Sequence, residues 1–483
     1  MVNLKLETEM KKLSLILFAA ASILAAACSK EISNTDKSSS ETIIPEEFVT
    51  YSFTAGSADV KSLLTNAGEF SWVAEDHIAI YNSTTSSYVI FEVESVDGSG
   101  NATITASAAP GAVWTNAIYP AERATGSDNE VDYTVDSVSG PILVSKVVGQ
   151  TLSFKYLGAV ANIQVEDAPD DAATLTFTAN TNVFGNRTFS WDGENPVLGG
   201  SGTQASITVP FTNTIISVPI PQVSYEGFTI TVDNKSGRHL YKKTTANPFD
   251  MTSKKLLTMP TLTYEAPRLY YVHTETADSK TYDGDFIMLQ RGANTFEVWV
   301  NCDANTTSYV YDEYNIGNDV TGKGCLASTA KVNDANKYRI SYDSSTNTAS
   351  MQYISGQYAN PYNWSGFYSN TVYLRGTFDG SNWSNSPNFT GSNHILTTTL
   401  TTSKNTGVFG IQASGDWWSA NTGDGNYQTI TDGGNGRYYA TLVKGSDSNQ
   451  SLSALPVGTY TVYANVLQDD YDDRPISLMF VKQ

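Results

Sequence analysis

Short runs in which apolar and polar residues alternate recur along this chain, and tight-turn dipeptides separate them. In the run 49–55 every second residue is apolar, and Asp97-Gly98, Asp192-Gly193 and Asp379-Gly380 punctuate other such runs. Period-two alternation is typical of a strand with one buried face, and Asp-Gly is a favoured hairpin turn. No stretch after residue 27 keeps apolar residues at helical spacing. The sequence therefore predicts an all-β protein with few, short helices.

The chain of 483 residues is long enough for several domains, since one domain typically takes about 100 to 150 residues. Many short strands with Gly- and Asn-rich turns favour tandem β-sandwiches. We expect a leader, a tether, two sandwiches of transthyretin-like type, an immunoglobulin-like sandwich and a final sandwich. The expected divisions are 1–27, 28–47, 48–148, 149–266, 268–355 and 370–483.

The leader has the features of a bacterial secretory signal. The basic start Met10–Lys12 is followed by the apolar Leu13–Leu24, and three alanines precede Cys28. Small residues before a cysteine resemble a lipobox, where a signal peptidase cuts before the cysteine and the thiol receives diacylglycerol. Each lipid CH₂ buried in a membrane contributes about 0.8 kcal/mol. We expect Cys28 to be a lipid anchor; the alternative is a plain signal peptide with an incidental cysteine.

Residues 29–47 are rich in Ser, Thr, Glu and Lys. Such a segment buries too little apolar surface to offset its ordering entropy, so we expect a flexible tether. Ser29-Lys30-Glu31 loosely resembles the acidic surface-export signals of Bacteroidetes lipoproteins. The expected location is therefore the outer membrane, with the folded part facing the cell surface. No later stretch approaches eighteen consecutive apolar residues, the length that would indicate a spanning helix.

The charge of the chain limits its ligands. Its formal net charge is −20, and so acidic a surface repels phosphate backbones, which argues against nucleic acid as a partner.

Two cysteines remain after cleavage at the leader, Cys302 and Cys325. An oxidising compartment permits a disulfide between them, but spacing alone does not fix its geometry. The alternative is that both cysteines stay reduced, as thiols. Two cysteines without a nearby His pair are too few ligands for a closed zinc site, so no metal is expected.

The first half of the chain resembles the fimbrillin-like (Mfa-like) lipoproteins of Bacteroidetes. The resemblance implies two transthyretin-like sandwiches in a pilus subunit, stalk or adhesin. Packing of the sheets explains the same residues without any function. The motifs are Phe70–Trp72, Asp76–Tyr81, Ala117–Pro120, Leu157–Val165, Val218–Gln222 and Ser253–Leu257.

The last 110 or so residues carry a different series of motifs. They resemble the carbohydrate-binding sandwiches of SusE/SusF-like lipoproteins, in which a strand leads to a loop Trp and a later strand ends at an Asp-Trp loop. The motifs are Val372–Phe378, Asn382-Trp383, Phe409–Gln412, Asp416–Trp418, Gly436–Tyr439 and Gly458–Val462.

A sugar ring has an apolar C–H face that a flat indole covers at low entropic cost. Trp383, Trp417 and Trp418 could supply such a platform. The polar groups that could bind sugar hydroxyls are Arg375, Asn382, Asp416, Asn421 and Gln412. In an extended strand the adjacent Trp417 and Trp418 point to opposite faces, so one of them belongs to the core, and the sequence does not say which. For Arg375 the alternative is a solvated charge at a strand edge.

Catalysis has little support. A glycosidase needs two carboxylates at a set separation, which sequence alone does not place, and no G-x-S-x-G motif lies near any of the four histidines. We therefore expect a non-enzyme without a cofactor that binds polysaccharide or oligosaccharide. Its protein partner would be a TonB-dependent transporter with its surface lipoprotein. The alternative is a fimbrial accessory protein or tip adhesin.

The anchor gives a direct prediction. Cys28→Ala removes the thiol that would carry the lipid, so metabolic labelling with a fatty acid should be lost and the protein should leave the membrane fraction. A variant that keeps both its label and its membrane association would contradict the lipoprotein interpretation.

Overall fold

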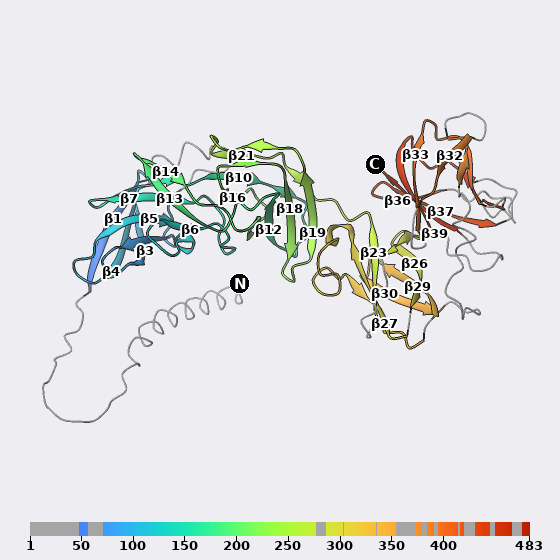
Figure 1. Ribbon diagram of the computed structural model, residues 1–483, viewed down its shortest axis with the longest axis horizontal. Helices are drawn as coiled ribbons and strands as arrows, with labels where there is room; N and C mark the ends of the chain where they lie inside the picture. Colours follow the sequence, from blue (N-terminus) through green and yellow to red (C-terminus); the bar gives the residue numbers. More distant parts are fainter. Residues whose placement is uncertain are drawn as a thin grey trace, which may run out of the picture. The chain divides into compact units, whose positions relative to one another are not determined.

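The computed structural model describes residues 48–56, 71–276, 286–302, 304–334, 336–353, 373–378, 384–390, 395–413, 416–419, 430–444, 450–465 and 476–483. Strands dominate every part of it (Figure 1). Across these residues the helical segments are two single 3₁₀ turns, η1 (Ala121–Arg123) and η2 (Glu313–Asn315). The predicted all-β class is confirmed. The described part of the chain contains no helix long and apolar enough to span a membrane.

Seven strands of the first unit close into a ring in the order β5-β2-β3-β4-β1-β8-β7, because β7 also pairs with β5. The short β9 pairs with β7 as well. The strands are β1 (Val49–Gly56), β2 (His77–Asn82), β3 (Ser87–Val96), β4 (Ala102–Ala108), β5 (Trp114–Tyr119), β7 (Leu143–Val148), β8 (Thr151–Ser153) and β9 (Lys155–Tyr156).

The interior of this ring is apolar. Alternate residues of β1 enter it, since Phe53 and Ala55 are buried while the intervening Thr54 is exposed. Trp72 is 3% exposed and packs against Phe154, with ring centroids 5.3 Å apart. These residues are therefore part of the packed core, as a strand pattern with one buried face predicts.

The second unit shares its core with the first. Ile118 and Val144 belong to the ring strands, yet they cluster with Leu175, Phe177 and many other buried residues of the second unit. The strands are β6 (Glu130–Asp132), β10 (Ala159–Ile163), β11 (Val165–Glu166), β12 (Ala172–Ala179), β13 (Asn186–Asp192), β14 (Asn195–Leu198), β15 (Ser206–Pro210), β16 (Ile216–Ile220), β17 (Ser224–Tyr225), β18 (Phe228–Asn234), β19 (His239–Thr245), β20 (Phe249–Asp250), β21 (Leu256–Thr258) and β22 (Leu262–Thr263).

Strand pairing crosses the expected division at residue 148. β8 and β9 follow that residue but pair within the first sheet, and β6 precedes it but pairs with β13. The first two units are joined by pairing as well as by a common core.

The third unit consists of two four-stranded sheets, β24-β23-β27-β28 and β25-β26-β29-β30. Their facing residues, such as Val272, Val298 and Ile340, form one core. The strands are β23 (Tyr270–Thr276), β24 (Phe286–Ile287), β25 (Leu289–Gln290), β26 (Thr295–Cys302), β27 (Thr306–Asp312), β28 (Ala327–Ser328), β29 (Asn336–Asp343) and β30 (Thr348–Tyr353).

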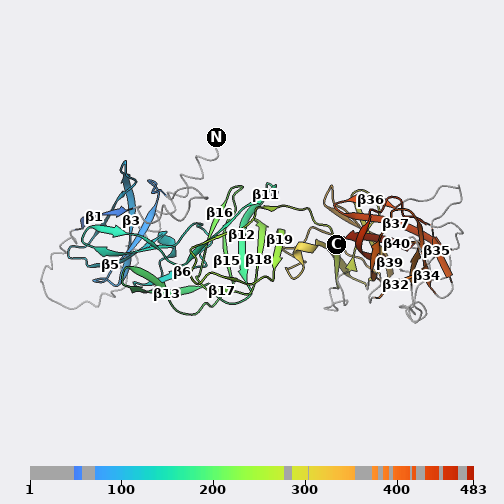
Figure 2. The ribbon, with the colours of Figure 1, turned by 90° about the horizontal axis from the view of Figure 1, so that it is seen from above.

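The fourth unit has one large sheet, whose main path runs β32-β31-β34-β35-β37-β40-β39-β33; β36 pairs with β37 and β38 with β34. Figure 2 shows β34, β35, β37 and β40 together in the orange-to-red part of the chain. The strands are β31 (Tyr373–Gly376), β32 (Ser384–Asn388), β33 (Ile395–Thr402), β34 (Val408–Ala413), β35 (Asp416–Ser419), β36 (Thr431–Gly434), β37 (Arg437–Lys444), β38 (Gln450–Ser451), β39 (Gly458–Asn465) and β40 (Ile476–Lys482).

The two cysteines of the third unit are thiols in the structure, and no disulfide joins them. Cys302 is buried at the end of β26. Cys325 is half-buried and its thiol donates to the carbonyl oxygen of Ala327 at 3.4 Å. Burial raises the pKa of the Cys325 thiol, which keeps it protonated and poorly reactive at neutral pH.

Thiol counting tests this state. The mature chain, denatured under non-reducing conditions, should show two titratable thiols, from Cys302 and Cys325. Mass spectrometry after alkylation should find both cysteines modified. Finding neither modified until a reductant is added would instead establish the bridge.

Candidate functional site

The candidate site lies on the sheet of the fourth unit, where β31, β34 and β35 are neighbours. Leu374 of β31 and Ile411 of β34 are paired in register, and both are 0% exposed in the core. Directly opposed residues of an antiparallel pair lie on the same face of the sheet. The strand register therefore identifies which positions of these strands belong to the core face.

The predicted residues on β35 take different register positions. Trp418 lies opposite the buried Ile411, whereas Trp417 lies opposite Gln412 and Asp416 opposite Ala413. The two tryptophans thus occupy opposite faces, as the alternation along a strand requires.

Arg375 lies on β31, opposite Gly410 of β34, and is half-buried. Its strand belongs to the same sheet as β35, which carries Trp417 and Trp418. Trp383, Asn382 and Asn421 lie outside the described residues, and so does the lipidation residue Cys28. Of the residues proposed to bind sugar, Arg375, Gln412, Asp416, Trp417 and Trp418 are placed on three adjoining strands. A further aromatic residue that the sequence analysis did not single out, Tyr373, lies opposite Gln412.

The other end of this sheet packs against the third unit. Met479 and Val481 of β40 cluster with the buried Ile287 and Leu289. Gly433 lies where a Cβ atom would collide with the side chain of Gln290, so this approach requires glycine.

Arg437 connects the fourth unit to the third and to the chain segment that precedes it. Its Nε donates to Oε1 of the buried Gln290 at 3.2 Å, and its Nη1 donates to the carbonyl oxygens of Pro267 and Arg268 at 2.9 and 3.0 Å. Its guanidinium carbon lies 5.1 Å from the centroid of the Phe296 ring. Burial lowers the pKa of Arg437, but a guanidinium stays charged at neutral pH.

Side chains from both units also hold the two preceding carbonyl groups. The Tyr314 hydroxyl donates to the carbonyl oxygen of Glu265, and Asn435 Nδ2 donates to that of Ala266, both at 2.7 Å. With the two bonds of Arg437, the four consecutive carbonyls of residues 265–268 all accept a side-chain hydrogen bond. The connector between the second and third units is therefore anchored by side chains of the third and fourth units.

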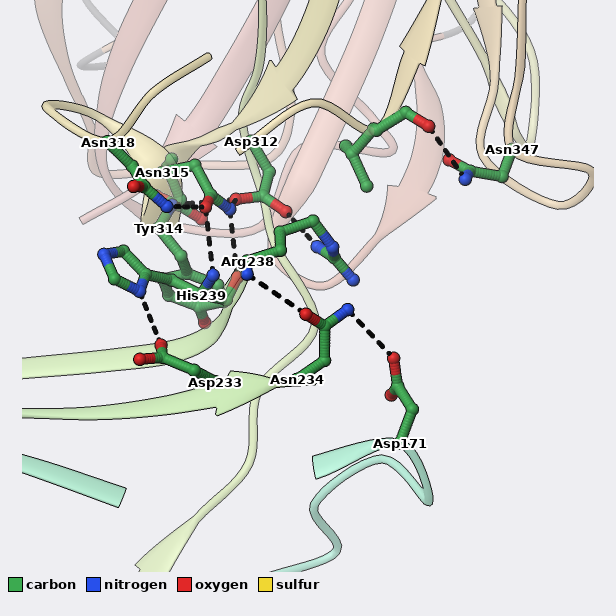
Figure 3. A network of polar contacts seen from close by, with 12 residues as sticks. Asp171, Asp233, Asn234, Arg238, His239, Asp312, Tyr314, Asn315, Asn318 and Asn347 are labelled. Atoms are coloured by element: carbon green, nitrogen blue, oxygen red, sulfur yellow. Dashed lines mark hydrogen bonds and ion pairs between the residues drawn. The ribbon is translucent and has the colours of Figure 1, made fainter. Parts of the chain in front are cut away.

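A second polar network joins the β18–β19 hairpin to the segment around η2 (Figure 3). Its centre is Asp312, 0% exposed, whose carboxylate accepts from Arg238 Nη1 at 3.1 Å and Asn315 Nδ2 at 2.7 Å. Asn315 also exchanges two hydrogen bonds with the backbone of His239. Burial raises the pKa of Asp312, while its hydrogen bonds and Arg238 oppose that shift. These groups satisfy one another, which marks the network as structural.

The described residues contain no cluster of three or more His, Cys, Asp or Glu side chains able to hold a metal ion. Buried arginines there donate hydrogen bonds to backbone carbonyl groups. Arg123, for example, is 0% exposed and donates to the carbonyl oxygens of Asp132, Val135 and Val138. Burial lowers its pKa to about 10.

Comparison with known proteins gives distant structural likeness. No protein-family model matches the chain, and no curated protein does. A proposed cell-adhesion protein from Bacteroides ovatus matches 42% of this chain and 89% of its own length, at 10% identity and a TM-score of 0.25. A second, from Bacteroides thetaiotaomicron, matches 40% and 81%, at 16% identity and a TM-score of 0.22.

SusF from Bacteroides thetaiotaomicron matches 75% of this chain and 73% of its own length, at 12% identity and a TM-score of 0.16. Scores this low identify no family. The interpretation of the site therefore depends on its own residues.

The network around Asp312 yields a stability prediction. Asp312→Ala leaves the half-buried Arg238 and the buried Asn315 without this acceptor, which should cost about 3 kcal/mol. Urea unfolding should show the loss as a lower midpoint. Asp343→Ala, at an exposed turn of the same unit, is the matched control and should change the midpoint little. A midpoint that Asp312→Ala leaves unchanged would contradict a stabilising role for the buried network.

Proposed function

We propose that this protein is a lipid-anchored, cell-surface lipoprotein that binds polysaccharide or oligosaccharide without catalysis, as part of a glycan-uptake system. The observation that carries the proposal is the placement of Arg375, Gln412, Asp416 and the Trp417-Trp418 pair on three adjoining strands of one sheet. Aromatic and polar residues in that combination suit a ligand with both apolar faces and hydroxyl groups.

The polar residues near these tryptophans fit binding better than bond cleavage. A glycosidase requires an acid and a second carboxylate, separated by a distance that depends on its stereochemistry. Asp416 is the acidic residue of β35. The other two polar residues proposed to bind sugar on these strands are Arg375 on β31 and Gln412 on β34, whose side chains form hydrogen bonds. This composition supports recognition of sugar hydroxyls.

The rest of the proposed function comes from the sequence. Cys28 would anchor the chain to the outer membrane, and residues 29–47 would hold the folded units away from it. The first two units would then act as a spacer. A TonB-dependent transporter with its surface lipoprotein would receive the captured glycan.

Glycan binding by the mature chain tests the proposal. The Cys28→Ala protein, purified in soluble form, should bind at least one polysaccharide in an affinity-gel or glycan-array screen covering plant, host and microbial glycans. Loss of the aromatic platform should reduce affinity by about 1 to 3 kcal/mol, by analogy with stacking on nucleobases. A folded protein that binds none of these glycans would favour the fimbrial adhesin instead.

A further inference from the structure

We infer that the interior of the third unit contains a binding site for ordered water, formed by the hydroxyl groups of Thr274, Thr306 and Ser308. The three side chains come from two neighbouring strands, β23 and β27, and each is 0% exposed. The site is separate from the strands proposed to bind sugar, which belong to the sheet of the fourth unit.

The strand register places these hydroxyl groups side by side in the core. Val272 and Val310 are paired across β23 and β27, and both belong to the apolar core between the two sheets. Thr274 and Ser308 form the next pair on the same face, since successive residues of a strand alternate between faces. Thr306 lies two residues before Ser308 on β27 and shares that face. Hydroxyl groups therefore continue a core face that begins with valines.

None of the three hydroxyl oxygens has a hydrogen-bond partner within the described part of the chain. A fourth buried hydroxyl group differs in this respect, because Thr329 Oγ1 accepts from the backbone N–H of Ser308 at 3.2 Å. Buried polar groups without a partner destabilise a fold, and native proteins rarely contain them. Three such groups on one face of one strand pair indicate a ligand that supplies the missing hydrogen bonds.

The spacing of the pair suits a bridging water molecule. Directly opposed residues of an antiparallel pair have Cβ atoms about 4.5 to 5.5 Å apart. A water oxygen lies about 2.8 Å from a hydroxyl partner, so one molecule can reach both Thr274 and Ser308. Thr306 is roughly 7 Å from Ser308 along the strand, which a second molecule can span. Buried waters typically make about three hydrogen bonds to groups of this kind.

Charge separates water from an ion as the ligand. Hydroxyl groups are neutral, and the described residues contain no group of three or more His, Cys, Asp or Glu side chains that could hold a metal ion. An ion buried without an opposite charge costs far more free energy than a buried neutral molecule. Water also both donates and accepts, as each hydroxyl group does.

Urea unfolding of the mature Cys28→Ala protein tests the site through the sign of one effect. Thr274→Val keeps the shape of the side chain and replaces its hydroxyl group by a methyl group. If water is bound, the substitution removes one of its partners, so the unfolding midpoint should fall. If the hydroxyl group is buried without a partner, its removal should raise the midpoint.

Thr307→Val is the matched control. Thr307 is half-buried and lies on the outer face of β27, between Thr306 and Ser308. It therefore reports the effect of exchanging Thr for Val in this strand without touching the core. A midpoint for Thr274→Val equal to or above that of Thr307→Val would overturn the water site.

The double variant Thr274→Val/Ser308→Ala tests whether the two hydroxyl groups share one ligand. Residues that hold the same water are coupled, so the double variant should lose less than the sum of the two single losses. A loss equal to that sum would show that no common water joins them.

A high-resolution crystal structure of the Cys28→Ala protein gives a direct test that needs no core substitution. It should show a water oxygen within about 3 Å of both Thr274 Oγ1 and Ser308 Oγ. Electron density of a metal ion at this place, or hydroxyl groups that contact apolar atoms alone, would overturn the inference. Neither result would bear on the proposed binding of glycan.

Discussion

Each strand of this protein has two faces, and the burial of one face fixes the role of the other. In the fourth unit, Leu374, Phe409 and Ile411 are fully buried in the core. The residues that alternate with them along each strand therefore lie on the other face of the sheet. Antiparallel pairing then carries that assignment from β34 to its neighbours. The packing of β40 against the third unit and the buried interior of the first ring both follow from this alternation.

The junctions between units depend on a different interaction, the hydrogen bonding of backbone groups by buried side chains. The carbonyl groups of residues 265–268 accept hydrogen bonds from the side chains of Arg437, Tyr314 and Asn435. The Asn315 side chain likewise donates to the carbonyl group of His239. Backbone groups that are buried without a partner are costly, so these bonds stabilise the close approach of separate units.

The sequence predicts the strand class well, because alternation such as that of residues 49–55 is local. It predicts the candidate site only in part. Adjacent Trp417 and Trp418 had to lie on opposite faces, but their assignment depends on Ile411, which pairs with Trp418 only in the folded sheet. The roles of Arg437 and Asp312 cannot be predicted from the nearby sequence. Pro267, whose carbonyl group Arg437 binds, lies more than a hundred residues away in the chain. Arg238, which donates to Asp312, lies about seventy residues away. The division at 148 has the same limitation, because β8 follows it but pairs with β1 and β7, which both precede it.

The closed ring of the first unit bears on how copies of this chain can meet. Open sheet edges are where proteins add strands from other molecules, and a stretch of strand that is paired on both sides offers none. The first strand, β1, pairs antiparallel with β4 along residues 49–55, and parallel with β8 at Thr54, Ala55 and Gly56. At Thr54 and Ala55, which pair on both sides, a strand from another copy can therefore enter only after a resident strand has left. Along residues 49–53 the described pairing covers one edge of β1, so the closure of the ring limits the addition of a strand over part of β1 alone.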